Sequence, residues 1–155
     1  MDGMLKRSPC VGICSTTYGD LVCRGCKRFA HEIVQWNGFE EGQRQLVWQR
    51  LLAIREGTVR DFLQLIDEPA LRSSAKALNI VEADAYDSFN LAYEVLRRLQ
   101  RRPADLAEVG LGLHAHQRQG LDAENVPRAL LERIDREFYQ RSVAHYERSF
   151  RTLAH

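Results

Sequence analysis

The chain has 155 residues, and its 22 Lys and Arg residues against 21 Asp and Glu residues give a formal net charge of +1. This balance excludes an overall basic field that would attract nucleic acid or acidic lipid. Charged residues at 28% and hydrophobic residues at 45% exclude a wholly disordered chain. No apolar run approaches the roughly 18–20 residues of a membrane span. Residues 1–7 lack the apolar core of a signal peptide, so we expect a cytoplasmic protein that binds no membrane.

The four cysteines are the most informative residues of the chain. Cys10, Cys14, Cys23 and Cys26 follow the pattern C-x3-C-x8-C-x2-C, and the remaining sequence contains no other cysteine. A disulfide framework requires an oxidising compartment, which the absence of an export signal disfavours. Four thiolates hold either a structural zinc ion or an iron–sulfur cluster, and the spacing does not decide between these cofactors.

Three cations surround the second cysteine pair, namely Arg24, Lys27 and Arg28. Nearby cations favour the thiolate form of cysteine, which is the form that binds metal. We therefore regard these residues as candidates for tuning the ligands from outside the coordination shell. The alternative interpretation is a solvated basic surface without influence on the sulfurs.

The cysteine segment resembles a known family. The residues that carry the likeness are Ser8-Pro9-Cys10-Val11-Gly12-Ile13-Cys14, Cys23-Arg24-Gly25-Cys26-Lys27-Arg28, Glu32-Ile33 and Trp36. They resemble the bacterial domain of unknown function 1289 family, whose short Cys-rich members are described as predicted iron–sulfur proteins. The resemblance covers roughly residues 8–56. It implies metal ligation by the four cysteines, and it implies no reaction.

The pattern after the cysteines is helical. Apolar residues recur at helical spacing over 29–36 and 41–55, and Gly57 is expected to end the second helix. A short helix is then expected from Thr58 through Ile66. Pro69 begins a helix that extends to about residue 78.

Two longer helices are predicted in the second half of the chain. One covers residues 85–102 with Asp84 as its N-cap, and the other covers 127–153 with Asn125 as its N-cap. The Gly110-Leu111-Gly112-Leu113 segment between them is expected to be a loop. It lacks the spacing of a dinucleotide-binding motif. No strand alternation of useful length is present.

Together these patterns predict a mostly α fold, with an irregular N-terminal four-cysteine metal-binding knuckle followed by a helical bundle. We expect two domains. Residues 1–57 form the metal-binding module with two short helices, and residues 58–155 form a helical domain. The wide apolar stripe of the last helix predicts packing on the core, or else a dimer interface.

An arginine cluster at the end of the 85–102 helix is the second candidate site. Arg97, Arg98, Arg101 and Arg102 either form an anion patch for nucleic acid or a nucleotide, or compensate the helix dipole. Residues from 61 onward carry 13 basic and 15 acidic residues, which is a poor footprint for nucleic acid. We therefore favour dipole compensation.

The functional hypothesis is a small, non-enzymatic metal-binding module that mediates a protein interaction or a redox step. One alternative is an iron–sulfur electron carrier or sensor for a partner enzyme. Another is a zinc-stabilised nucleic-acid-binding protein. The sequence offers no nucleophile–base pair and no phosphate loop, so it gives no support to an enzyme.

Overall fold

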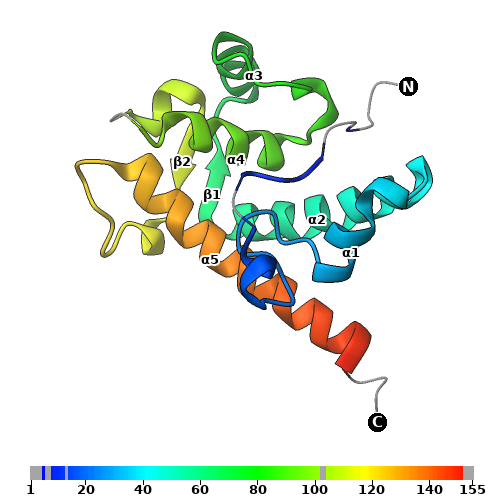
Figure 1. Cartoon of the computed structure of the whole chain (residues 1–155). Helices are drawn as coiled ribbons and strands as arrows, with labels where there is room; N and C mark the ends of the chain where they lie inside the picture. The colour runs from blue at the N-terminus through cyan, green and yellow to red at the C-terminus, as the bar shows by residue number, and fades with distance from the viewer. Residues whose placement is uncertain (1–4, 6–7, 13, 102–103, 152–155) are drawn as a thin grey trace. The chain divides into compact units, whose positions relative to one another are not determined.

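The computed structural model describes residues 5, 8–12, 14–101 and 104–151 (Figure 1). They form two compact units, which we describe one at a time. The cysteine unit contains the described residues of Met4–Ile54 and Arg136–His155, and the central unit contains Arg55–Asp135. The division falls within the two long helices, α2 (Glu41–Phe62) and α5 (Val126–Tyr146), so each of these helices contributes to both units.

The predicted mostly helical class is confirmed, because helices account for most of the described residues. No helix in this part of the chain has the length and apolar character needed to cross a membrane. The predicted domains, 1–57 and 58–155, stay a prediction.

The cysteine unit contains short elements before the long helix begins. A 3-10 turn, η1 (Ser15–Tyr18), is followed by α1 (Ala30–Gln35) and by the 3-10 turn η2 (Trp36–Gly38). Helix α1 begins where the backbone N–H of Phe29 donates to Glu32 Oε1 at 2.8 Å. The same local device starts α2, because the Glu40 N–H donates to Gln43 Oε1 at 2.8 Å. The predicted helix starts near residues 29 and 41 are confirmed.

The predicted stop at Gly57 is wrong, because α2 continues through it to Phe62. Glycine inside a helix costs only about 1 kcal/mol relative to alanine. The residues that follow it gain more than that by burial, since Thr58 and Val59 are fully buried. Thr58 therefore lies inside α2, and the predicted helix start at this residue is wrong.

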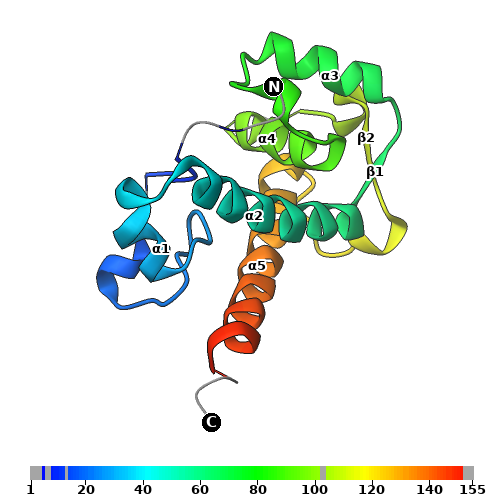
Figure 2. The ribbon, with the colours of Figure 1, turned by 90° about the vertical axis from the view of Figure 1, so that its right-hand side faces the viewer.

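The central unit contains a small antiparallel sheet and two helices that pack side by side. Strand β1 (Leu63–Leu65) pairs with β2 (Leu111–Leu113), and Gln64 lies opposite Gly112. Figures 1 and 2 both place α3 (Glu68–Ala77) beside α4 (Ser88–Leu99). The prediction of a helix through Ile66 is wrong, because residues 63–65 form a strand. The prediction of a loop at 110–113 is also wrong, because residues 111–113 form the partner strand. Three-residue strands are too short to show an alternating pattern.

Aspartate N-caps define both helices of this pair. Asp67 Oδ1 accepts the Ala70 N–H at 3.1 Å, and Asp87 Oδ1 accepts the Asn90 N–H at 3.0 Å. The predicted cap Asp84 is wrong, because it lies in a separate 3-10 turn, η3 (Ala83–Ala85). The helix expected over 85–102 consequently begins at Ser88.

The last helix begins as predicted, since Asn125 Oδ1 accepts the Arg128 N–H at 3.2 Å. Helix α5 ends earlier than expected, at Tyr146, and a π-helical turn (Glu147–Arg151) follows it. Residues 152 and 153 of the predicted helix lie outside the described residues.

Candidate metal centre

The second cysteine pair lies at the tip of a tight hairpin. Val22 and Phe29 form an antiparallel bridge at its base. Inside the hairpin, the Cys23 N–H donates to the Arg28 carbonyl at 2.9 Å, and the Lys27 N–H donates to the Cys23 carbonyl at 2.8 Å. Lys27 adopts a left-handed conformation with φ +66°, which reverses the chain directly after Cys26. This folding brings the two cysteines of the C-x2-C motif to one side of a single turn.

Cys23 and Cys26 are both buried but differ in their ease of ionisation. Burial opposes ionisation of Cys23, yet hydrogen bonds from the backbone N–H groups of Cys26, Ser15 and Gly25 outweigh it and lower the pKa of this thiol. Burial dominates at Cys26 and raises its pKa, although the Arg28 guanidinium acts in the opposite direction. The hairpin therefore favours ionisation of Cys23 over that of Cys26.

Cys14 approaches the hairpin from η1. Its sulfur lies 2.9 Å from Thr16 Oγ1, and this hydrogen bond is the main reason that the pKa of Cys14 is lowered. The charge of Cys23 acts on Cys14 in the opposite sense, which shows that the two sulfurs are close enough to interact. The Arg24 N–H donates to Ser15 Oγ at 2.8 Å and ties η1 to the hairpin.

Cys10 differs from the other three cysteines in being exposed. Its sulfur accepts the Gly12 N–H at 3.4 Å, and its own N–H donates to Ser8 Oγ at 3.2 Å. The charge of Cys23 thus acts on both Cys14 and Cys26. Within the described ranges, no three or more His, Cys, Asp or Glu side chains are grouped closely enough to hold a metal ion.

The S-P-C start, the C-x-G-C hairpin and helix α1, which contains Glu32, form one continuous segment. Residues 8–55 match the family model described as Protein of unknown function (DUF1289). The match confirms the resemblance noted in the sequence and covers about a third of the chain. No curated protein and no solved structure matches the chain significantly.

The three cations predicted to flank the sulfurs of the DUF1289 segment have different surroundings. Arg28 Nε donates to Cys26 Sγ at 3.3 Å, so this buried guanidinium touches a candidate ligand. Lys27 is fully buried, and its ammonium group donates to the Gly25 carbonyl at 2.9 Å. Arg24 pairs with Asp20 at 3.2 Å. One of the three cations therefore contacts a sulfur directly, and the influence of the others stays a prediction.

Aromatic residues from the end of the chain cover the DUF1289 hairpin. The Phe29 ring lies 5.0 Å from the Tyr146 ring and 5.6 Å from the Phe150 ring, measured between centroids. The Arg24 guanidinium lies 4.8 Å from the centre of the Tyr139 ring, and the Lys27 ammonium lies 5.1 Å from that of Phe138. The sequence predicts the apolar stripe of this helix but does not indicate what it packs against.

An ion pair supports the same hairpin from α2. Glu32 binds Arg50 through both carboxylate oxygens, one of them at 2.7 Å from Arg50 Nη2. The Arg50 guanidinium stacks 3.9 Å from the centre of the Phe29 ring. Glu32 belonged to the residues that carried the family resemblance, but nothing in the sequence indicated Arg50 as its partner.

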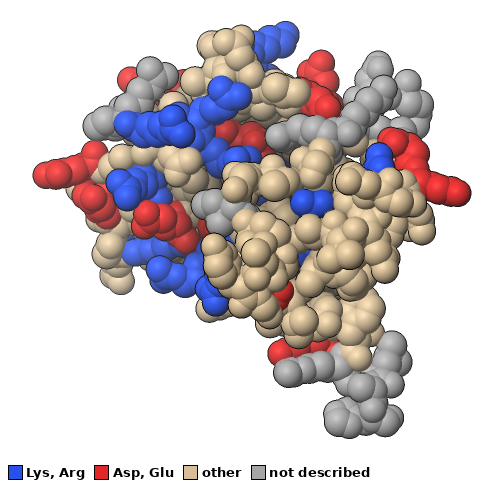
Figure 3. Space-filling model, viewed as in Figure 1, with Lys and Arg blue, Asp and Glu red and all other residues tan. Residues whose placement is uncertain are grey.

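Two arginines of the predicted cluster have partners within the protein. Arg97 Nη1 pairs with Glu94 at 3.3 Å, and Arg98 donates to the carbonyl groups of Leu78 and Asn79 at 3.2 and 3.4 Å. Arg101 is exposed, whereas Arg102 lies outside the described residues. Figure 3 shows basic side chains lying among acidic ones over this part of the chain. An anion-binding role for this cluster stays a prediction.

Proposed function

We propose that the DUF1289 segment is a metal-binding module in which Cys10, Cys14, Cys23 and Cys26 hold one metal centre. The observation that supports this proposal is that each of the four sulfurs has a hydrogen-bond partner within its own segment. Hydrogen bonds to sulfur stabilise thiolates, and thiolates are the form of cysteine that binds zinc or iron.

Cys14, Cys23 and Cys26 would supply three of the four thiolates, although their side chains are not grouped closely enough in the described residues to hold a metal ion as they stand. Cys14, Cys23 and Cys26 interact through Cys23, which is buried and receives backbone N–H groups. Cys10 would supply the fourth sulfur from the exposed arm that contains Gly12. Four thiolates with no open position suit a structural zinc ion or an iron–sulfur cluster better than a hydrolytic metal.

The metal would supply either a cross-link between η1 and the hairpin or a redox centre near the protein surface. The surface around the cysteines supports a protein partner more than nucleic acid. Tyr18 is 90% exposed and Leu21 is 53% exposed, and both lie between Cys14 and Cys23 in the chain. Tyrosine is enriched at interfaces between proteins, because its ring is largely apolar and its hydroxyl can form hydrogen bonds.

The decisive experiment is a determination of metal and acid-labile sulfide in the full chain, purified without oxygen, together with its absorption spectrum. We expect one metal centre per chain. Iron with matching sulfide and visible absorbance identifies a cluster, whereas one zinc ion without sulfide or colour identifies a structural site. Protein that contains neither metal after purification and anaerobic reconstitution would overturn the proposal.

Cysteine variants assign the ligands. We expect Cys23→Ser and Cys14→Ser each to lower the metal content about tenfold or more, in keeping with the loss of a thiolate ligand. His31→Gln is the matched control, because His31 is the exposed imidazole next to the hairpin and should be dispensable. Cys10→Ser tests the fourth position. Full metal content in the Cys23→Ser variant would contradict the assignment.

A further inference from the structure

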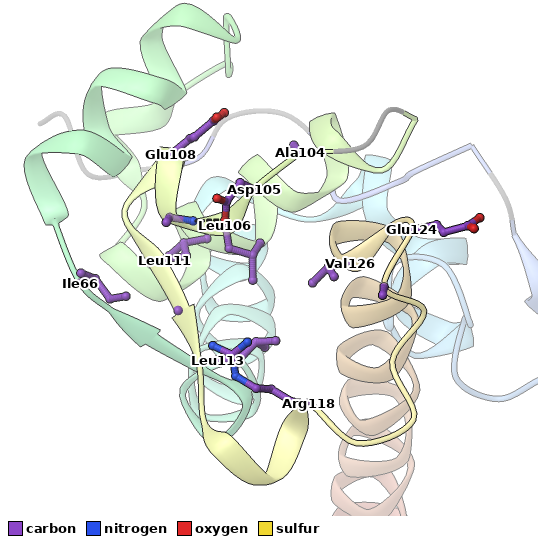
Figure 4. A pocket seen from close by; sticks show the side chains of 13 residues that line it. Ile66, Ala104, Asp105, Leu106, Glu108, Leu111, Leu113, Arg118, Glu124 and Val126 are labelled. Atoms are coloured by element: carbon purple, nitrogen blue, oxygen red, sulfur yellow. Dashed lines mark hydrogen bonds between the residues drawn. The ribbon is translucent and has the colours of Figure 1, made fainter.

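A pocket in the central unit is lined by η4 (Leu106–Val109), strand β2 and the start of α5 (Figure 4). Its volume is about 620 Å³, which is within the range of about 300–1,000 Å³ typical of sites for small molecules. Leu106 and Leu111 are almost fully buried and close its inner side. Ile66, which is 65% exposed, and Val126 add to the apolar lining. The pocket therefore suits a small molecule with an apolar body.

The ionisable side chains of the pocket are divided between its two ends. In Figure 4, the carboxylates of Asp105, Glu108 and Glu124 lie towards one end. The Arg118 side chain lies beside Leu113 at the other end. Glu108 and Glu124 point away from the apolar lining, so Asp105 is the carboxylate best placed to contact an occupant. The pocket is thus negative at one end and positive at the other.

The guanidinium group of Arg118 is available to a ligand. It is exposed and forms no ion pair or side-chain hydrogen bond with another residue in the described part of the chain. Two arginines of α5 are engaged, because Arg128 pairs with Glu132 at 3.4 Å and Arg133 donates to the Gln117 carbonyl at 2.9 Å. A planar guanidinium binds a carboxylate through two parallel hydrogen bonds. Arg118 therefore fits a carboxylate on the occupant.

The carboxylate of Asp105 can accept a donor at the opposite end. Its Oδ1 atom accepts the Ala107 N–H at 3.1 Å, and this cap of η4 fixes the position of the carboxylate. Its Oδ2 atom has no partner among the residues that the structure describes. An ammonium group donates to such an oxygen in a charge-assisted hydrogen bond. The two ends of the pocket therefore fit the two charges of a zwitterion.

The separation of the two ends selects the kind of zwitterion. Leu111 lies nearer to Asp105 and Leu113 lies beside Arg118, and these leucines are about 7 Å apart along an extended strand. An α-amino acid carries both charges on one carbon atom and is too short to reach both ends. Two residues of extended chain span about 7 Å with the charges at their ends. We propose that this pocket binds an apolar dipeptide with free termini, its ammonium group on Asp105 and its carboxylate on Arg118.

The test is a calorimetric titration of the full chain with valyl-leucine and with two blocked forms of it. N-acetyl-valyl-leucine keeps only the carboxylate, and valyl-leucine amide keeps only the ammonium group. We expect each block to weaken binding about tenfold, since each removes one charge-assisted contact. A blocked form that binds as tightly as the free dipeptide would show a site for a simple anion or cation and would overturn the proposal. Absence of binding up to about 10 mM valyl-leucine would also overturn it.

The variant Arg118→Gln assigns the carboxylate of the dipeptide. We expect it to weaken valyl-leucine about tenfold and to leave the affinity for the amide unchanged, because the amide has no carboxylate for Arg118 to bind. Arg128→Gln is the matched control, since Arg128 is an exposed arginine outside the lining of the pocket. Its affinity should stay within about twofold of that of the unchanged protein. Equal losses for the free and the amidated dipeptide in Arg118→Gln would contradict the assignment.

The variant Asp105→Asn tests the other end of the pocket. Asparagine keeps an oxygen for the Ala107 N–H and removes the negative charge. We expect valyl-leucine to bind about tenfold more weakly and the acetylated form to bind as before. Asp122→Asn is the matched control, because Asp122 Oδ1 accepts the Glu124 N–H at 3.0 Å in the same way without lining the pocket. An equal effect of Asp105→Asn on both forms would exclude the ammonium contact.

The proposal does not depend on the metal centre. The metal content of these variants should equal that of the unchanged protein, so loss of dipeptide binding is distinct from failure of the metal-centre proposal. The comparison of free and blocked dipeptides uses the unchanged protein and stays decisive even if a variant fails to fold.

Discussion

The two units of the protein differ in how much of their interior is aliphatic. In the central unit Leu91, Val95 and Leu96 of α4 expose no surface, and this unit also buries one ion pair, Arg55 with Glu94 at 2.9 Å. In the cysteine unit the buried set includes Lys27, Arg28 and Glu32 as well as Cys23. A buried charge stabilises a fold only when it is paired and hydrogen-bonded, whereas a buried leucine stabilises it without a partner.

The exposed apolar residues show the same difference. Of the large hydrophobic residues that are exposed in the described part of the chain, two belong to the central unit, Ile66 and Val81. Those of the cysteine unit are Val11, Tyr18, Leu21, Val34, Leu46 and Phe150. A unit that leaves this much apolar surface outside its core gains less from hydrophobic burial, and a metal cross-link would compensate for that deficit.

Metal removal should produce the largest difference between the units. After prolonged treatment with a chelator, we expect the amides of Cys23 and Lys27 to lose about a hundredfold or more of their hydrogen-exchange protection, which corresponds to roughly 2.7 kcal/mol. The amides of Val95 and Leu96 should keep theirs. Unchanged protection at Cys23 would show that side-chain contacts alone hold the hairpin.

A core truncation should destabilise the central unit strongly. Leu96→Ala removes a fully buried side chain, and we expect the free energy of unfolding to fall by about 3 kcal/mol. Leu46→Ala in the cysteine unit is the control, because Leu46 is 66% exposed and its loss should cost less than about 0.5 kcal/mol. Urea denaturation measures both values. Similar losses in the two variants would contradict the assignment of the core.

The N-cap of α4 should have a moderate effect. Asp87→Ala removes the acceptor for the Asn90 N–H, and we expect a loss of about 1 kcal/mol of unfolding free energy. Asp84→Ala changes the aspartate that the sequence favoured as the cap, and it should be nearly neutral. Thermal unfolding of the two variants compares them directly, and a larger effect at Asp84 would restore the original prediction.

The smallest effect concerns the pH dependence of the cysteine unit. Burial, followed by the positive charge of Arg50 and that of Arg148, lowers the pKa of His145, while Glu32 acts in the opposite direction. Below its ordinary pKa of roughly 6.5, the imidazole is protonated more readily in the unfolded chain than in the folded one. The stability that neutral His145 contributes is therefore complete above a pH of roughly 6.5. It is lost as the pH falls towards the lowered pKa of His145 in the folded chain.

The measurement for His145 is the slope of unfolding free energy against pH. We expect His145→Gln to reduce the uptake of protons on unfolding just below pH 6.5 by a fraction of one proton, with little change near pH 8. An unaltered slope would assign the pH dependence of the unit to other groups.

Much of the helical content could be predicted from the sequence because its signals are local. The apolar spacing around Phe29, the cap at Asn125 and the proline at position 69 each act within one or two helical turns. Gly57 does not end α2 as predicted, because its local cost of about 1 kcal/mol is outweighed by burial of the residues that follow it. Strands β1 and β2 were missed because each is short and its partner is remote in the chain.

The sequence by itself determined that four cysteines occupy one short segment, that this segment belongs to a recognisable pattern, and that helices follow it. These properties depend on spacing and on residue type, which are written in the chain. Only the tertiary structure decided that Cys23 interacts with Cys14 and Cys26 while Cys10 stays exposed, and that Phe29 meets the aromatic rings of Tyr146 and Phe150. Contacts between distant segments depend on how whole elements pack, and no local pattern specifies that packing.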